Sequence, residues 1–398
     1  MTESNPNNSA AWVPFAYGFR PFFLLAGSYA ALSVAAWIWV WRTGGWPLQQ
    51  LPPQYWHGHE MIFGFIAAAI AGFLLTAVPS WTGSRGFAGT QLVVLTLLWV
   101  AGRIAFSLGD TLPVMVLAAV ELAFIPMLGA MLAPALLRSG NRNWPMLVLL
   151  ALFWAADSAF LHGMGAGDPL ISRTAMLAAL NVVLVLITII GGRIVPAFTG
   201  NALQARGIEV SLRSAPVVER LLMLTMLAML FCDLFLPGSA MTPAVAASAA
   251  LLHLWRFAGW HGWRTGGQPI LWVLHLAYLW LPLGLGLKAA SLAGGFAWAA
   301  HWLHALGIGA AGLMILAVMT RAALGHTGRP LQVRGSITVA YGLLALSVIV
   351  RVFGPLIVPL DYLAVVIAAA ILWIMAFLLF LAVYTPILLR PRVDGRRG

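Results

Sequence analysis

Apolar segments long enough to cross a bilayer recur from one end of this 398-residue chain to the other. A helix needs about 20 apolar residues to span the hydrocarbon of a membrane. Twelve segments approach or reach this length: 22–41, 59–78, 91–108, 112–137, 145–163, 174–195, 217–236, 242–258, 269–291, 297–319, 336–355 and 360–388. Because 62% of the residues are hydrophobic and only 8% are charged, we predict an all-α, polytopic membrane protein with about twelve transmembrane helices. The lipid bilayer is then its main partner, and residues 1–398 form a single transmembrane domain.

The cysteine content limits the kinds of cofactor attachment. Cys232 is the only cysteine, which excludes an intrachain disulfide, a CxxC site and covalent haem attachment through CxxCH. Any haem in this protein would be held by coordination and packing, as a b-type haem is. The first apolar segment is too long for the core of a signal peptide, so we expect it to be a retained helix.

The net charge of +11 is distributed in a way that indicates membrane orientation rather than nucleic-acid binding. With twelve spans, seventeen arginines fall on the side that carries both termini, and only Arg42, Arg173, Lys288 and Arg351 fall on the other. Cytoplasmic loops are the ones enriched in basic residues. We therefore predict that both termini are in the cytoplasm.

Three similar segments suggest an internal repeat. VPSWTG (78–83), VPAFTG (195–200) and LGHTG (324–328) each end in a ring side chain followed by Thr-Gly, and each lies four spans after the last. A triplicated four-helix unit, with repeats at 1–137, 138–258 and 259–398, would produce this pattern. The alternative is that Thr-Gly is simply a common turn dipeptide.

The histidines strengthen the repeat hypothesis in two of its three units. His59 precedes Thr82 by 23 residues, and His304 precedes Thr327 by the same number. Five residues after each histidine comes a glycine, Gly64 or Gly309, which would leave room for a flat macrocycle. The corresponding position in the middle unit is Met176, so the third copy has no histidine.

Several ionisable residues are expected near the outer membrane face. His57, His59, His162, His301 and His304 share this predicted depth, together with Glu60, Arg103 and Asp157. Ionisable groups within spans are costly and usually mark function. Imidazole is a ligand for haem iron and for copper, and a carboxylate such as Glu60 can orient a ligating histidine. The alternative is that these histidines are ordinary interfacial residues.

A second set of histidines is expected near the cytoplasmic face: His253, His261, His275 and His326. His275 and Tyr278 are three residues apart and so share a helix face. Such pairs are often polar contacts between helices. His326 lies between Arg321 and Arg329, where it could bind an anion or anchor a helix end among headgroups.

Long motifs give the chain a family resemblance. FAYGFRPFFLLAG (15–27), WHGHEMIFGFIAAAIAGFLLTAVPSWTG (56–83), GGRIVPAFTGNAL (191–203), LHLAYLWLPLG (274–284), HALGIGAAGLMILAVMTRAALGHTGRPL (304–331) and YTPILLRPRVDGRRG (384–398) closely resemble the NnrS family. The resemblance implies a twelve-span inner-membrane protein containing haem and copper, associated with denitrification and with tolerance of nitric oxide and nitrosative stress. It leaves open whether the protein is an enzyme.

The motif matches carry over a set of candidate metal ligands and supporting residues. These are His57, His59, His275, His304 and His326 as ligands, with Glu60 beside them. To these we add Arg103, Asp157 and Tyr278, from their positions in the spans, as neighbours that orient the ligands. At the level of architecture, the chain also resembles haem–copper oxidases, whose haem-ligating histidines lie on the second and tenth spans. The sixth and seventh spans, which supply copper ligands in those oxidases, contain no histidine in this sequence.

We therefore expect His59 and His304 to face each other as the axial ligands of a haem near the outer face, with nitric oxide as the small ligand. One alternative function is a secondary transporter of a small solute or metal, which would use broken helices at mid-membrane. Another is a gas or redox sensor without turnover.

Overall fold

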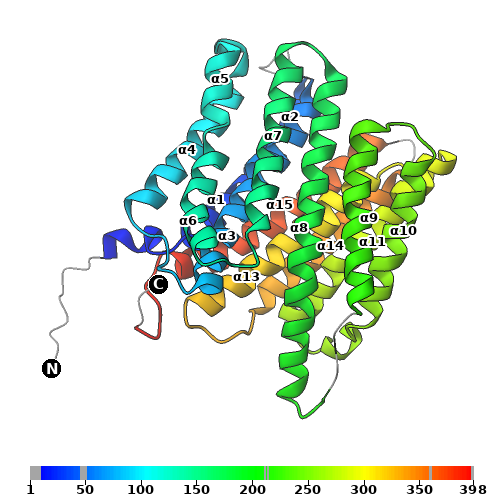
Figure 1. Cartoon of the computed structure of the whole chain (residues 1–398). Coiled ribbons are helices and arrows are strands. Elements are labelled where there is room, and N and C mark those ends of the chain that lie inside the picture. Colours follow the sequence, from blue (N-terminus) through cyan, green and yellow to red (C-terminus); the bar gives the residue numbers. More distant parts are fainter. Residues whose placement is uncertain (1–9, 45–51, 210–211, 213–214, 358–360, 396–398) are drawn as a thin grey trace, which may run out of the picture.

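The computed structural model describes residues 10–44, 52–209, 212, 215–357 and 361–395. All regular secondary structure within these ranges is helical, and the helices pack side by side as one bundle (Figure 1). The predicted all-α class is therefore confirmed.

The helices follow one another in this order. The first part of the chain forms η1 (Ala10–Phe15), α1 (Phe19–Thr43), α2 (Pro53–His59), η2 (Glu60–Ile66), α3 (Ala67–Thr82), α4 (Thr90–Ser107), η3 (Gly109–Thr111), α5 (Val114–Glu121), α6 (Phe124–Arg138), α7 (Pro145–Gly165) and α8 (Pro169–Gln204). The second part forms α9 (Pro216–Phe235), α10 (Met241–Ala258), η4 (Gly262–Thr265), α11 (Pro269–Gly294), η5 (Ala297–Ala299), α12 (Trp302–His304), η6 (Ala305–Gly312), α13 (Leu313–His326), α14 (Gly335–Ile357) and α15 (Tyr362–Leu388).

Ten of the predicted spans are long and apolar enough to cross a membrane: α1, α2 to α3, α4, α5 to α6, α7, α8, α11, η5 to α13, α14 and α15. The chain is therefore a polytopic membrane protein. α9 and α10 occupy the seventh and eighth predicted spans, but they are less apolar because α9 carries Glu219, Arg220 and Asp233 and α10 carries His253 and Arg256. A total of twelve spans stays a prediction for these two helices.

Two predicted segments differ in their boundaries. α8 continues nine residues past the predicted span 174–195, into what was expected to be a polar connection. Its 36 residues correspond to about 54 Å, against about 30 Å of hydrocarbon. The fourth span is interrupted by Leu122 and Ala123, between α5 and α6. Pro126 explains the interruption, because it has no N–H to donate to the carbonyl of Leu122.

A π-helix begins directly after each of the two histidines at equivalent spacing. His59 precedes η2 and His304 precedes η6, and both η2 and η6 are π-helical. Such wide turns occur often at functional sites. Thr82 ends α3 and Thr327 directly follows α13. These shared features support the predicted repeat. The middle unit differs, because α8 is α-helical throughout and Thr199 lies five residues before its end.

The most buried helices form the centre of the bundle. In the spans that contain α3, α8, α11 and α13, 67–78% of the apolar stretch is buried inside the protein. In the span formed by α5 and α6 the buried share is 28%. α4, α5 and α6 lie on one side of the bundle, and α9 and α10 on the other (Figure 1). α1 packs against both α3 and α15, so helices from the two ends of the chain are neighbours.

Candidate metal centre

Six helical elements bring six polar side chains together inside the bundle. We call them the His59 cluster: Tyr29 (α1), His59 (α2), Glu60 (η2), Arg103 (α4), Glu121 (α5) and Asp157 (α7). The side chains of His59 and Glu60 are completely buried, and those of Arg103, Glu121 and Asp157 nearly so. The break in the fourth span fixes Glu121, which is the last residue of α5.

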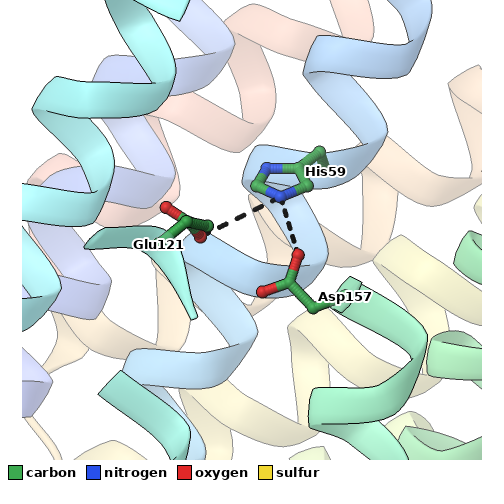
Figure 2. A group of neighbouring side chains, drawn as sticks. All are labelled: His59, Glu121 and Asp157. Atoms are coloured by element: carbon green, nitrogen blue, oxygen red, sulfur yellow. Dashed lines mark hydrogen bonds and ion pairs between the residues drawn. The ribbon is translucent and has the colours of Figure 1, made fainter. Parts of the chain in front are cut away.

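His59 has a carboxylate at each ring nitrogen. Its Nδ1 lies 2.9 Å from Oε1 of Glu60, and its Nε2 lies 3.1 Å from Oδ1 of Asp157. Oε1 of Glu121 lies 3.9 Å from the same Nε2. In Figure 2 the imidazole edge points between the Glu121 and Asp157 carboxylates, which come from two different helices.

Aromatic rings surround the histidine. The Phe106 ring stacks on His59 at a centroid distance of 3.8 Å, and Phe63 and Phe160 approach to 5.0 and 4.8 Å. These rings replace water around the imidazole. Electrostatic interactions within the cluster are therefore weakly screened.

Arg103 joins two of the carboxylates. Its guanidinium donates to Oε1 of Glu60 over 2.6 Å and also to Oε1 of Glu121. The Tyr29 hydroxyl donates to Oε2 of Glu60. The remaining Glu121 oxygen, Oε2, is buried and has no hydrogen-bond partner among the described residues. Both carboxylate oxygens of Glu60 therefore accept hydrogen bonds, whereas one oxygen of Glu121 accepts none from the described residues.

His59, Glu121 and Asp157 can hold a metal ion. Each offers one ligand atom, and these three atoms lie within 4.8 Å of one another. A cavity of about 10 Å³ is lined by Glu121 and Asp157 together with Arg103 and Gly102. This is about the volume that a single water molecule requires.

A second histidine group lies at the end of α2 and around α12. His57 is in the last turn of α2, His301 directly precedes α12 and His304 ends it, and His57, His301 and Arg351 all lie near His304. The His301 and His304 ring centroids are 6.4 Å apart, and Arg351 donates to Nδ1 of His301 over 3.3 Å. We call His57, His301 and His304 the three-histidine group.

His57 is held in place by a ring contact. Its imidazole stacks on Trp37 with centroids 4.8 Å apart. Its Nδ1 is buried without a hydrogen-bond partner among the described residues. The expected pairing of His59 with His304 about one haem stays a prediction, and both ring nitrogens of His59 face carboxylates.

The glycines near the two histidines accommodate side chains of the protein itself. A Cβ atom on Gly64 would lie 2.6 Å from the Tyr29 ring. A Cβ atom on Gly309 would lie 2.5 Å from the Trp280 ring. The space expected for a macrocycle beside these glycines is therefore filled by Tyr29 and Trp280.

His275 and Tyr278 take part in contacts between helices. Nε2 of His275 lies 2.8 Å from the Thr199 hydroxyl on α8. The Tyr278 hydroxyl lies 2.7 Å from Nδ1 of His253 and accepts from Arg256 over 3.1 Å. Neither residue belongs to the His59 cluster or to the three-histidine group.

His326 ends α13, whereas His304 ends α12, near the other end of the same predicted span. Its ring packs on Tyr17 and Phe19, and its carbonyl accepts from Arg392 over 2.8 Å. Burial raises the pKa of Tyr17, which precedes α1. His326 also lines a cavity of about 260 Å³, which is otherwise mostly apolar.

This cavity adjoins a second one, with which it shares part of its lining. The second cavity has a volume of about 90 Å³ and is lined by apolar residues of α1, α3, α8 and α13. Both are lined by Phe23, Phe73, Ile194 and Val318. We call the two together the central cavity.

The structure thus brings together four of the predicted residues, His59, Glu60, Arg103 and Asp157, in one site. Sequence reasoning did not include Glu121 in that site, although its charge within an apolar span was the available signal. Tyr29 gave no signal, since a tyrosine in an apolar segment is usually interfacial.

The fold and the buried histidine–carboxylate site define the class: a polytopic helical membrane protein with a candidate metal centre between its helices. The chain matches the NnrS protein family over residues 13–392. It belongs to that family, which is linked to the nitric oxide response. Among curated proteins, no match to the chain is found.

Proposed function

We propose that this protein handles nitric oxide, or the products of nitrosative stress, in the bacterial inner membrane, using haem and copper held non-covalently by its histidines. Membership of the NnrS family supports the biological setting. The observations that support the cofactor part are the contact between the His301 and His304 rings, with centroids 6.4 Å apart, and the buried Nδ1 of His57, which has no hydrogen-bond partner among the described residues.

The three-histidine group fits copper better than the His59 cluster does. Imidazole nitrogens are favoured copper ligands, whereas oxygen-rich sites suit harder ions. The buried Nδ1 of His57 has no partner among the described residues, as expected of a nitrogen reserved for a ligand. Trp37 holds the His57 ring in one orientation. Copper bound there would supply a metal that binds a small diatomic ligand.

The central cavity supplies features that a haem would need. Its larger part, about 260 Å³, is lined mainly by apolar side chains, with the His326 imidazole and the Arg321 guanidinium as polar groups in its wall. Cofactor pockets in proteins are typically about 300–1,000 Å³, so a modest displacement of side chains would be required. His326 would hold the iron, and Arg321, which stacks on Phe198 at 3.8 Å, would pair with a propionate. A bound haem would supply an iron that binds nitric oxide.

A secondary transporter is the second candidate function, and one observation favours it. The fourth span is interrupted beside Glu121, inside the buried His59 cluster. Transporters build ion sites from discontinuous helices of this kind. Such a protein would bind its ion without an absorbing cofactor.

An optical spectrum of the purified full-length protein tests the proposal. A Soret band that shifts when nitric oxide is added supports it, and His326→Ala should remove most of that band. His162→Ala is the matched control, because His162 is exposed on α7. A preparation from haem-sufficient cells that contains neither haem nor copper would contradict the proposal and favour the transporter.

A further inference from the structure

The His59 cluster contains more buried negative charge than positive charge. Three carboxylates, Glu60, Glu121 and Asp157, are accompanied by the single guanidinium of Arg103. With a neutral His59, two negative charges have no counterpart, and with a charged His59 one still has none. Unpaired charges are costly to bury, especially within a membrane. The cluster therefore requires additional positive charge, as protons or as a cation.

The hydrogen bonding of His59 points to where that charge belongs. A neutral imidazole has only one N–H, yet both nitrogens face carboxylate oxygens, at 2.9 Å and 3.1 Å. If Nδ1 donates to Glu60, the lone pair of Nε2 faces an oxygen of Asp157. Two acceptors in such contact repel each other unless a positive charge lies between them.

The geometry beside Nε2 suits a metal ion. An ion with bonds of about 2.0–2.2 Å holds its ligand atoms roughly 3–3.5 Å apart. The distances from Nε2 of His59 to the nearest oxygens of Asp157 and Glu121 are 3.1 Å and 3.9 Å. Glu121 also has its second oxygen, Oε2, buried without a partner among the described residues. A small carboxylate rotation would present that oxygen while Arg103 keeps the other.

We propose that His59, Asp157 and Glu121 bind one divalent cation of the Fe²⁺, Mn²⁺ or Zn²⁺ class. One nitrogen and two carboxylates form a donor set of intermediate to hard character, without sulfur, which favours these ions over Cu⁺. A divalent charge together with Arg103 balances the three carboxylates when His59 is neutral. This site is separate from the three-histidine group and does not depend on haem or copper being bound.

Glu60 and Arg103 position the ligands in this arrangement. Glu60 accepts from Nδ1 of His59, which directs the lone pair of Nε2 toward the ion. Arg103 and Tyr29 hold Glu60 in turn, and Arg103 also holds Glu121.

Elemental analysis of the full-length protein, purified from cells supplied with iron, manganese and zinc, tests the site. We expect about one equivalent of these metals per chain, reduced at least tenfold in Asp157→Asn and in Glu121→Gln. Glu219→Gln is the matched control, because Glu219 is partly exposed and pairs with Arg256 outside the cluster. The haem and copper contents should be the same in all four proteins.

A stability measurement distinguishes a variant that has lost the metal site from one that has misfolded. A chelator should lower the unfolding temperature of the parent protein and of Glu219→Gln, but not that of Asp157→Asn, since only a protein that binds the ion is stabilised by it. Metal contents that do not differ between the parent and both cluster variants would overturn the proposal. A parent that takes up no added Mn²⁺ would also overturn it, and the carboxylates would then be neutralised by protons.

Discussion

The guanidinium of Arg103 donates to the Glu60 carboxylate over 2.6 Å, and this bond links α4 to the first residue of the π-helix η2. The same guanidinium reaches Glu121 at the end of α5. One cation thus connects three successive predicted spans inside the bundle. The fold in this region depends on it.

Replacement of Arg103 should therefore be strongly destabilising. Arg103→Gln leaves Glu60 and Glu121 buried without their cation, and breaking a buried ion pair from one side typically costs about 3–5 kcal/mol. Thermal unfolding in detergent or lipid nanodiscs measures the loss. Arg138→Gln is the control, since Arg138 is exposed at the end of α6. Equal unfolding temperatures for the two variants would contradict the prediction.

The tight contact between Gly309 and Trp280 gives a second prediction. A Cβ on Gly309 would lie 2.5 Å from Trp280, whereas a Cβ on Gly307, in the same π-helix, meets nothing within 4 Å. Overpacking of a filled interior costs about 1–3 kcal/mol. Gly309→Ala should lower the unfolding temperature clearly and Gly307→Ala should not. Equal unfolding temperatures for the two variants would contradict the close contact between Gly309 and Trp280.

Most of the fold could be predicted from the sequence, because length and apolarity determine where a helix can cross a membrane. The ionisable residues His59, Glu60, Arg103 and Asp157 were also recognisable, since charges inside apolar spans are rare. The sequence could not show which side chains these residues contact. His59 and Asp157 are 98 residues apart, and no periodicity links them.

The local backbone was harder to predict than the spans. The π-helices η2 and η6 follow from packing around Gly64 and Gly309, where Tyr29 and Trp280 approach the backbone closely. The sequence of an apolar segment does not indicate whether it forms an α-helix or a π-helix. The position of Glu121 similarly depends on the break before Pro126, which composition alone does not locate.

Membrane orientation is the third prediction. The excess of arginines in loops on the side of the termini predicts that the C-terminus is cytoplasmic. A reporter fused after Gly398 should be active only in the cytoplasm, and a reporter inserted between α1 and α2 only in the periplasm. The same compartment for both would mean that an even number of spans, rather than the predicted eleven, follows α1.

The final prediction concerns Lys288, which joins α11 to the less apolar helix α9. Its buried Nζ contacts Asp233 and lies 3.1 Å from Sδ of Met229, and Asn181 of α8 donates to the same Asp233 oxygen over 2.7 Å. Asp233→Asn leaves a buried ammonium without its carboxylate, and Lys288→Met leaves the carboxylate without its ammonium. Each should lower stability by several kcal/mol, about 3–5 on the scale of one-sided losses of buried pairs.

The double variant Lys288→Met with Asp233→Asn removes both charges and should lose less stability than the sum of the two single losses. This partial recovery measures the coupling between the two residues, expected to be at the upper end of about 0.5–3 kcal/mol for groups in direct contact. Unfolding of the four proteins under one condition completes the cycle. Recovery would show that α9 packs within the bundle through this pair, as a membrane-spanning helix must if it carries Asp233. Additive losses would instead mean that water neutralises both groups, and α9 would then lie at the membrane surface.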